Sequence, residues 1–386
     1  MVPIFAARWR LPALGFGLGL AFALAAGSAS LSGAPALPPQ PVDGRLIPAY
    51  QSDRIWNGVT LTGGGRVFVA FPGDGPGIQL GEINADGKAV PYPDAAWNGW
   101  IAGQDQAQAP KAAFVHVNAL RIGPDGKLWV VDAGAPGIGK AAVPGGARLI
   151  RFDLVKNAVE QIYPLQAGVK PKSFIDDFRF NGENVYLTDA GEPALLVLNM
   201  RTGVVRRLLD GDVSTTDHRP VMADGKVLRD EKGKPVWIHA DQIEVAPDGH
   251  EVYYQPASGP MSRIAAGWLD DSTLDPATIG TYVEPWLDTP TAGGTAIDAE
   301  GSIYLTDPNH RRILKIARDK TVTTLVADPR LIWADALWID HDGFLWIPAT
   351  QMNLGKGLNN GKSEIRYPVW IYKMKIGVGP APNDHS

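Results

Sequence analysis

One hairpin pattern, repeated six times along the chain, restricts the possible fold more than any other feature. Each copy has a short strand with alternating apolar residues, a turn that usually contains Gly, and a return strand rich in Val, Tyr, Trp and Leu. Those are the signs of a β-hairpin. One clear copy is "DQIEVAPDGHEVYYQPASG". The copies begin at Asn57, Asn118, Asp176, Asp241, Gly293 and Asp335.

Further strands follow most copies, so the repeating unit is larger than a hairpin. Stretches such as "ARLIRFDL", "ALLVLNM" and "PVWIYKMK" supply a third strand, and "MRTGVVRRLLD" continues through a turn into a fourth. Four strands repeated six times predict an all-β fold, a six-bladed β-propeller. A pair of β-sandwiches is the alternative, but it does not account for one pattern that recurs six times.

The N-terminal segment has the layout of an export signal. Arg8 and Arg10 precede the apolar run "LPALGFGLGLAFALAAG", and "GSAS" supplies small residues. This predicts a signal peptide over 1–29, cleaved near Ala29, and a secreted or periplasmic protein. An uncleaved membrane anchor is the alternative, since the run is near the shortest that spans a bilayer. We then expect a linker at 30–48, the propeller at 49–376 and a C-terminal tail at 377–386.

Composition narrows the classes of function. The chain has 386 residues, a net charge of −5 and no block of Lys or Arg, so we expect no nucleic-acid partner. It contains no Cys, which rules out disulfides and means that burial must hold the fold together. We expect a monomer with no stable membrane association after signal cleavage. No nucleophile elbow, phosphate loop, zinc motif or dinucleotide fingerprint is visible.

Equivalent positions at the strand starts bring polar residues together. In a propeller the innermost strands line the central channel, so their first residues converge on one mouth. When the copies are aligned on the aromatic residue of the second strand, His116 and His239 fall at equivalent positions, two residues before a strand start. Strand alternation puts them on the same face as the starting residues. Their neighbours in this ring are Asn57, Asn118, Phe174, Asp176, Asp241, Trp333 and Asp335.

This ring predicts a ligand pocket with polar walls and aromatic surfaces. Three carboxylates packed together raise one another's pKa unless a cation or donors compensate, which marks a candidate functional site. The alternative is structural, since Asp and Asn often cap strand ends. We predict a small-molecule site without a cofactor. Its catalytic residues are His116, His239 and Asp241, and the other six ring members bind the ligand.

Several stretches resemble the Yellow / major royal jelly protein family. The most specific are "VWIHADQIEVAPDGHEVYYQPASG" and "DPRLIWADALWIDHDGFLWIPATQM". The resemblance implies a secreted six-bladed propeller. It also implies a link to dopachrome conversion, as in some members, or amine binding in the central cavity, as in others. The lack of Cys and the Ala-rich, bacterial-type leader depart from the secreted animal members and put a role in melanin chemistry in doubt.

Two functions follow from the ring and the resemblance. A dopachrome-type tautomerase would use His116 or His239 as the base, with Asp241 or Asp176 orienting it or stabilising charge. A binding protein without catalysis would instead hold an aromatic amine. Its cation would lie near the carboxylates and its ring against an aromatic wall.

A metal-dependent lactonase, similar to the gluconolactonase / regucalcin family, is the third hypothesis. The metal-site positions of that family fall at or near Asn57, Asp241 and Gly293 here. Gly293 has no side-chain oxygen, and Ca²⁺ needs many oxygen ligands. The sequence leaves open a different arrangement, with a divalent metal such as Ca²⁺ held by Asp176, Asp241 and Asp335.

Other features are interpreted as scaffold. The polar segment 214–235 predicts a hairpin insertion before the fourth blade, either a lid over the pocket or a solvated loop. Asp132, Asp189 and Asp307 are interpreted as turn and strand-pairing residues. We expect the aromatic residues of the second strands to fill the core between blades: Trp129, Tyr186, Tyr253, Tyr304 and Trp346.

Overall fold

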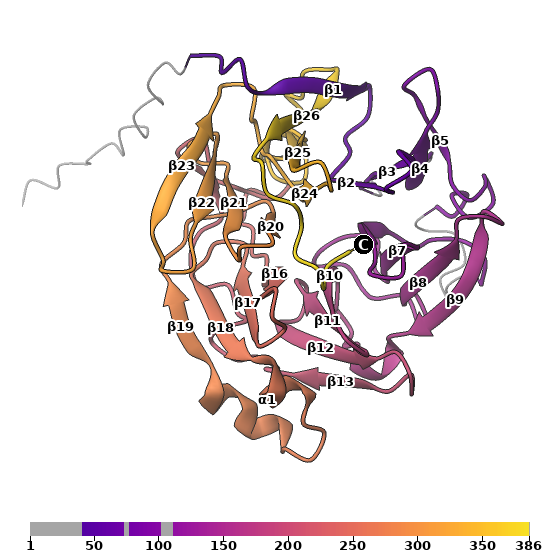
Figure 1. The fold of residues 1–386 in the computed structure, drawn as a ribbon, viewed down its shortest axis with the longest axis vertical. Coiled ribbons are helices and arrows are strands. Elements are labelled where there is room, and N and C mark those ends of the chain that lie inside the picture. Colours follow the sequence, from indigo (N-terminus) through magenta and orange to yellow (C-terminus); the bar gives the residue numbers. More distant parts are fainter. Residues whose placement is uncertain (1–40, 73–76, 102–110, 386) are drawn as a thin grey trace, which may run out of the picture. The chain divides into compact units, whose positions relative to one another are not determined.

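The computed structural model describes residues 41–72, 77–101 and 111–385, and it forms six four-stranded antiparallel sheets (Figure 1). The predicted six-bladed propeller is therefore confirmed. The predicted signal peptide and most of the predicted linker lie outside the described residues, and export stays a prediction. In the described part of the chain, no helix is long and apolar enough to cross a membrane.

Five blades are built from consecutive strands, innermost strand first. Blade 1 has β2 (Gly58–Leu61), β3 (Val67–Ala70), β4 (Leu80–Ile83) and β5 (Ala89–Pro91). Blade 2 has β6 (Val117–Ile122), β7 (Leu128–Ala133), β8 (Ala147–Asp153) and β9 (Ala158–Pro164). Blade 3 has β10 (Ile175–Asn181), β11 (Asn184–Asp189), β12 (Ala194–Asn199) and β13 (Val205–Leu208).

Blade 4 has β16 (Ala240–Val245), β17 (Glu251–Pro256), β18 (Met261–Ala265) and β19 (Glu284–Leu287). Blade 5 has β20 (Thr295–Ile297), β21 (Ile303–Asp307), β22 (Arg312–Ile316) and β23 (Val322–Ala327). Short helices join some elements: η1 (Gln166–Gly168), α1 (Ala266–Asp270), η2 (Pro276–Tyr282) and η3 (Met352–Leu354).

The last blade joins the two ends of the chain. It contains β24 (Trp338–Ile339), β25 (Phe344–Ala349), β26 (Val369–Lys375) and, on its outer edge, β1 (Ile47–Ser52). β1 pairs antiparallel with β26 from Ile47 opposite Lys373 to Ser52 opposite Val369. The ring of blades is thus closed by backbone hydrogen bonds between strands from opposite ends of the sequence.

Aromatic residues of the second strands fill the core between blades, as expected. Trp129 packs in one buried cluster with Phe178 and Phe180 of the next blade, and the Trp129 and Phe180 rings are 5.2 Å apart. Tyr186 is buried in a cluster that includes blade 4 residues. Tyr253 is only half-buried, but it also packs against a buried cluster that includes blade 5 residues, and its ring lies 4.7 Å from that of Trp286.

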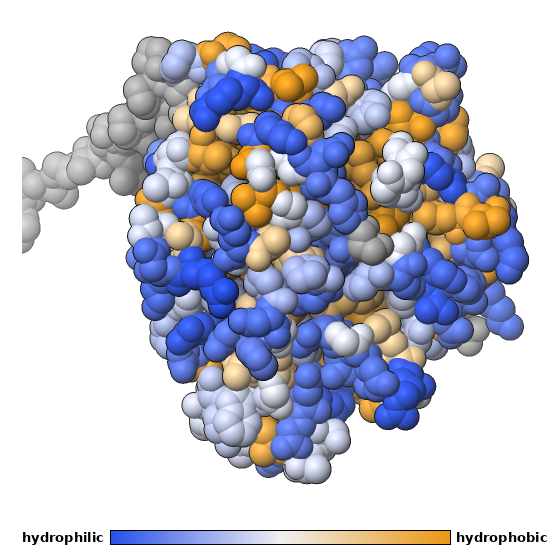
Figure 2. Space-filling view, viewed as in Figure 1, coloured by the Kyte–Doolittle hydropathy of each residue, from blue (hydrophilic) through white to orange (hydrophobic). Residues whose placement is uncertain are grey.

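The C-terminal segment, expected as a tail, folds back into the ring of blades (Figure 1). Its Pro380 bridges to Asp298 of blade 5, and Asp384 and His385 are buried. The His385 ring stacks on Trp338 at 3.8 Å. Figure 2 shows that mostly polar residues cover the same view of the molecule, with apolar residues scattered among them, as is usual for a protein surface.

Candidate functional site

A cavity of about 650 Å³ lies where the innermost strands begin. It is lined by all nine residues that the sequence brought to one ring: Asn57, His116, Asn118, Phe174, Asp176, His239, Asp241, Trp333 and Asp335. Gly293, the fifth-blade member, also lines it. The structure therefore places the predicted residues together, while their catalytic and binding roles stay predictions.

β-Bulges at the strand starts turn these side chains toward the cavity. The strand register shifts at Asn118 in β6, at Asp176 and Asp177 in β10, and at Asp241 in β16. A bulge leaves a residue out of the ladder and re-aims its side chain. The Thr188 hydroxyl links two of these bulges, since it accepts from the Asp177 N–H and donates to the Asp241 carbonyl.

Close packing between blades explains the missing side chain in blade 5. A Cβ at Gly293 would lie 2.3 Å from the Ala334 carbonyl oxygen. Any larger residue would push blade 5 away from blade 6. The gap in the ring of polar residues is thus required by packing.

A chain of amide hydrogen bonds runs along one side of the cavity. The Asn57 side-chain amide donates to the Asn118 carbonyl at 3.0 Å, and the Asn118 amide donates to the Asp176 carboxyl. Asn57 is only 6% exposed, and its Oδ1 has no hydrogen-bond partner within the described part of the chain. A buried acceptor without a donor is costly, so a group that donates to it would be stabilised there.

The three ring carboxyls lack a compensating cation. Burial raises the pKa of Asp176 and Asp241 well above the ordinary value, and the like charges of Asp177 and Asp335 raise both further. Burial also raises the pKa of Asp335 to about 7. None of the three ring carboxyls forms an ion pair within the described ranges. The neighbouring Asp177, which is not a ring member, pairs with Arg179 at 2.7 Å.

Two buried aromatic rings form apolar walls. Phe174 packs edge-on against the His116 ring, with 5.0 Å between ring centres. Trp333 donates from its indole Nε1 to Asp335 Oδ2 at 3.0 Å. Trp333 has a φ of 47°, a left-handed conformation that is rare for a bulky residue and often found at functional sites. Its carbonyl is held by the Thr350 hydroxyl at 3.0 Å.

The two histidines at equivalent positions carry their protons on different nitrogens. His239 Nδ1 accepts from the Asp217 backbone N–H at 3.1 Å, so a neutral His239 has its proton on Nε2. Burial lowers the pKa of His239, which favours this neutral form. His116 Nδ1 lies 3.1 Å from the Pro136 carbonyl oxygen, which can only accept, so this nitrogen carries a proton.

Aspartates behind the ring hold the entering backbone in place. Asp132 accepts from the backbone N–H of Val115 and His116, and Asp189 accepts from that of Phe174. Each also pairs with an arginine, Arg148 and Arg207 respectively. The interpretation of Asp132 and Asp189 as scaffold is thus confirmed.

Blade 4 uses an aspartate that the repeat pattern did not indicate. Asp217 accepts from the Ile238 backbone N–H at 3.0 Å and from the Ser258 hydroxyl. It comes from the insertion and not from the blade, so comparison of the repeats could not find it. In the sequence it lies in the polar stretch "DHRP", 22 residues before His239.

Comparison with known proteins identifies the family. The family model "Major royal jelly protein" matches residues 115–378, more than half of the chain. The chain belongs to this family. No curated protein matches it.

Solved structures share the fold of this major royal jelly protein family member. A gluconolactonase from Xanthomonas campestris has a TM-score of 0.51 at 11% identity, over 90% of this chain and 99% of that one. A luciferin-regenerating enzyme has a TM-score of 0.52 at 11% identity, over 87% and 96% of the two chains. Virginiamycin B lyase from Staphylococcus aureus has a TM-score of 0.46 at 15% identity, over 88% and 91%. At such identities the likeness shows the fold alone.

The insertion of this family member packs over the cavity. Its strands β14 (Met222–Ala223) and β15 (Lys226–Val227) form a hairpin, and Leu228 is buried in a cluster with Phe174 and Trp333. Arg229 exchanges backbone hydrogen bonds with the loop at 358–360 after β25. Of the two readings of this segment, the structure supports a packed cover and not a solvated loop.

The cover and nearby loops add cavity residues that the sequence did not indicate. Trp237, which follows the insertion, is 47% exposed although it lines the cavity. Such exposure of a large aromatic residue at a cavity mouth is typical of a ligand contact. Further lining residues are Pro72, Gly137, Ile138, Gly139, Lys172, Gly191, Asp230, Pro235, Val236, Ile238, Met352, Gly357 and Leu358.

The donor geometry does not support the metal hypothesis. Across the described ranges of the chain, no three His, Cys, Asp or Glu side chains are arranged so that they could hold a metal ion. Asp176, Asp241 and Asp335 are therefore not such a group, and Gly293 offers no oxygen at the fifth blade. The metal-dependent lactonase stays a hypothesis.

Proposed function

We propose that this protein binds a small aromatic amine in its central cavity. The observation that carries the proposal is the set of three buried carboxyls without an ion pair, Asp176, Asp241 and Asp335. A ligand cation would supply the missing positive charge. Charge-assisted hydrogen bonds of this kind are about twice as strong as neutral ones.

The walls favour an aromatic ligand. Phe174 and Trp333 are buried cavity residues, and both belong to the cluster under the cover. An aromatic face attracts a nearby cation, and two rings gain stacking and burial. A cavity of about 650 Å³ falls within the range of small-molecule sites. The amine-binding members that the family resemblance implies are consistent with the same ligand class.

Calorimetric titration with a matched pair of ligands tests the proposal. We expect 2-phenylethylamine to bind and 2-phenylethanol, which has the same ring but no charge, to bind at least about tenfold more weakly. Asp241→Asn should weaken amine binding by about 10- to 100-fold. Asp86→Asn, at an exposed turn of blade 1, is the control and should bind like the wild type. Equal affinity for the amine and the alcohol would refute the proposal.

A dopachrome-type tautomerase is a second candidate, favoured by the opposite proton positions of the two histidines. Tautomerisation needs one group to take a proton and another to return one. His116 would take a proton at Nε2, since its Nδ1 is already protonated, and His239 would donate from Nε2. Dopachrome decolorisation should then exceed the spontaneous rate and fall to it in His116→Ala and His239→Ala. A wild-type rate equal to the spontaneous rate would remove this candidate.

A further inference from the structure

We propose that the ligand carries an anionic group at the end opposite to its ammonium, and that Lys172 at the cavity mouth pairs with this group. The ligand class is thereby narrowed from aromatic amines to aromatic amines that bear an acid group, such as a carboxylate, on the far side of the ring. The inference rests on the proposed function, because it takes the ammonium to lie at the ring carboxyls.

Lys172 is an unpaired cation in the wall of the cavity. Among the described residues that line the cavity, it is the only Lys or Arg. It is exposed, and its ammonium forms no ion pair or hydrogen bond within the described ranges. Lys170, two positions earlier, instead pairs with Asp210 at 2.6 Å. An ammonium that faces a cavity without an anion is available for a charge-assisted hydrogen bond to a ligand.

The backbone that carries Lys172 is held in place by its neighbours. The Ser173 N–H donates to the Lys170 carbonyl at 3.1 Å, and the Lys170 N–H donates to the Ser173 hydroxyl at 2.8 Å, which closes a turn around Lys172. The same hydroxyl donates to Asp189 at 2.5 Å. A Cβ at Gly191 would overlap the Lys172 carbonyl oxygen, so this loop packs closely against the turn. The flexible four-carbon arm of Lys172 therefore starts from a fixed point.

Lys172, Phe174 and Asp176 follow one another along the wall of the cavity. All three line it, whereas the two residues between them do not. Lys172 is exposed, while Phe174 and Asp176 are 3% and 8% exposed. From the mouth inward, blade 3 thus presents a cation, an aromatic ring and a carboxyl. Four residues of extended chain span at most about 13 Å, so a ligand with a charged group at each end of one aromatic ring can reach both ends of this row.

The cover contributes one acid to the cavity wall, Asp230, which would suit a ligand with a second cation instead. Asp230 is half-buried, and its Oδ1 accepts from the backbone N–H groups of Lys232 and Lys234 at 2.9 and 2.8 Å. This carboxylate therefore already has donors in its own turn. The Lys172 ammonium has no such partners in the described part of the chain. The contacts favour an anionic group on the ligand over a second cation.

Calorimetric titration with 4-(2-aminoethyl)benzoate and 4-(2-aminoethyl)benzamide tests the pairing. The two ligands share the ammonium and nearly the same shape, and they differ in charge at the far end. We expect the wild type to bind the benzoate about three- to fivefold more tightly than the benzamide. This preference should shrink as NaCl is added, because salt screens an ion pair near the solvent. Equal affinities would overturn the proposal, and so would a preference for the benzamide, which would indicate that Asp230 dominates this end of the cavity.

Variants of the lysine identify the group that reads the anion. Lys172→Met should bind the benzoate and the benzamide equally, and Lys172→Arg should keep the preference for the benzoate. Lys170→Met is the matched control, because it removes one positive charge two positions away from a residue that does not line the cavity. It should show the wild-type preference. A preference that persists in Lys172→Met would refute the proposal.

A fourth ligand, 4-ethylbenzoate, carries the acid group without the ammonium and separates this proposal from the proposed function. If 2-phenylethylamine binds better than 2-phenylethanol but the benzoate has no advantage over the benzamide, the pairing fails and the proposed function stands. If 4-ethylbenzoate binds to the wild type and not to Lys172→Met, while the amine has no advantage over the alcohol, the proposed function fails and the anion site at Lys172 stands. If none of these ligands binds, both are refuted.

Discussion

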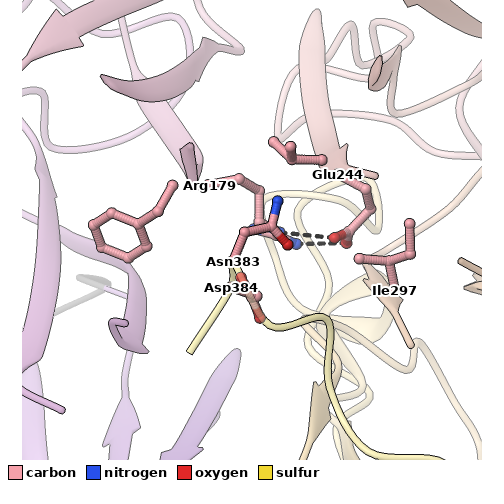
Figure 3. Close-up of a pocket in the computed structure, with 7 residues that line it drawn as sticks. Arg179, Glu244, Ile297, Asn383 and Asp384 are labelled. Carbon is pink, nitrogen blue, oxygen red and sulfur yellow. Dashed lines mark hydrogen bonds and ion pairs between the residues drawn. The ribbon is translucent and has the colours of Figure 1, made fainter. Parts of the chain in front are cut away.

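Buried carboxyl groups occur at both ends of the central channel, but only those at one end are paired with cations. At the cavity, Asp176, Asp241 and Asp335 have no cation beside them. At the other end, Arg179 donates to Glu244 through two hydrogen bonds of 2.9 and 2.7 Å (Figure 3). Burial alone would raise the pKa of Asp384 there, but Arg121 and His385 outweigh it and hold that pKa well below its usual range.

The residues that face the cavity and the residues of the paired group lie only three positions apart on the same innermost strands. Arg121 follows Asn118 by three positions, and Arg179 and Glu244 follow Asp176 and Asp241 in the same way. Three strand residues span about 10 Å. The same strands thus build a charge-balanced layer that the C-terminal segment covers, and an unbalanced layer that faces the cavity. We interpret the first as structural and the second as available for a ligand.

The largest expected effect comes from breaking the balanced layer. Arg179→Met leaves Glu244, which is 1% exposed at its side chain, without its cation. Removing one partner of a buried ion pair typically costs about 3–5 kcal/mol. Urea denaturation at pH 7 should show this loss. Arg318→Met, which breaks the exposed pair with Asp248, should cost less than about 1 kcal/mol; equal losses in the two variants would contradict the account.

Removing a carboxyl from the layer that faces the cavity should increase the free energy of unfolding instead of lowering it. Because the pKa of Asp241 is raised on folding, its contribution to stability is greatest below the unfolded pKa of 3.8 and is lost as pH rises through the folded pKa. Asp241→Asn should therefore raise the free energy of unfolding by about 1–3 kcal/mol at pH 8 and change it little at pH 4. Urea denaturation at the two pH values measures this, and a variant less stable at pH 8 would argue against uncompensated carboxyls.

The smallest effect is expected at Asp384, with the opposite dependence on pH. Its lowered pKa means that the carboxylate stabilises the fold above the unfolded pKa of 3.8, and that this contribution is lost as pH falls through the folded pKa. Asp384→Asn should cost about 1 kcal/mol at pH 7 and less as the pH approaches 3. Thermal unfolding over this pH range tests the trend, which fails if the cost is the same throughout.

The repeats were sufficient to predict the fold and to locate the ring of cavity residues. A strand periodicity of two and the shared turn position decide which residues of each blade face the channel, and those rules apply equally to all six copies. The same alignment also contained the balanced layer, because Arg121, Arg179 and Glu244 occupy one equivalent position three residues further on.

Segments outside the repeat could not be placed in this way. The insertion that supplies Asp217 and covers the cavity has no counterpart in other blades, and neither has the C-terminal segment that buries His385. Their positions depend on contacts between residues far apart in sequence, such as the bonds of Arg229 with the loop at 358–360. Proton positions on the histidines likewise depend on single backbone groups, Pro136 and Asp217.

The most direct test of the contrast between the two layers is to follow the side-chain carboxyl ¹³C signals of Asp176, Asp241, Asp335 and Asp384 from pH 3 to pH 9, assigned with Asp→Asn variants. The account predicts that Asp384 stays ionised throughout, that Asp176 and Asp241 ionise well above the pH at which an ordinary aspartate does, and that Asp335 titrates at about pH 7. If all four carboxyls are ionised by pH 5, the cavity is not short of positive charge and the account is wrong.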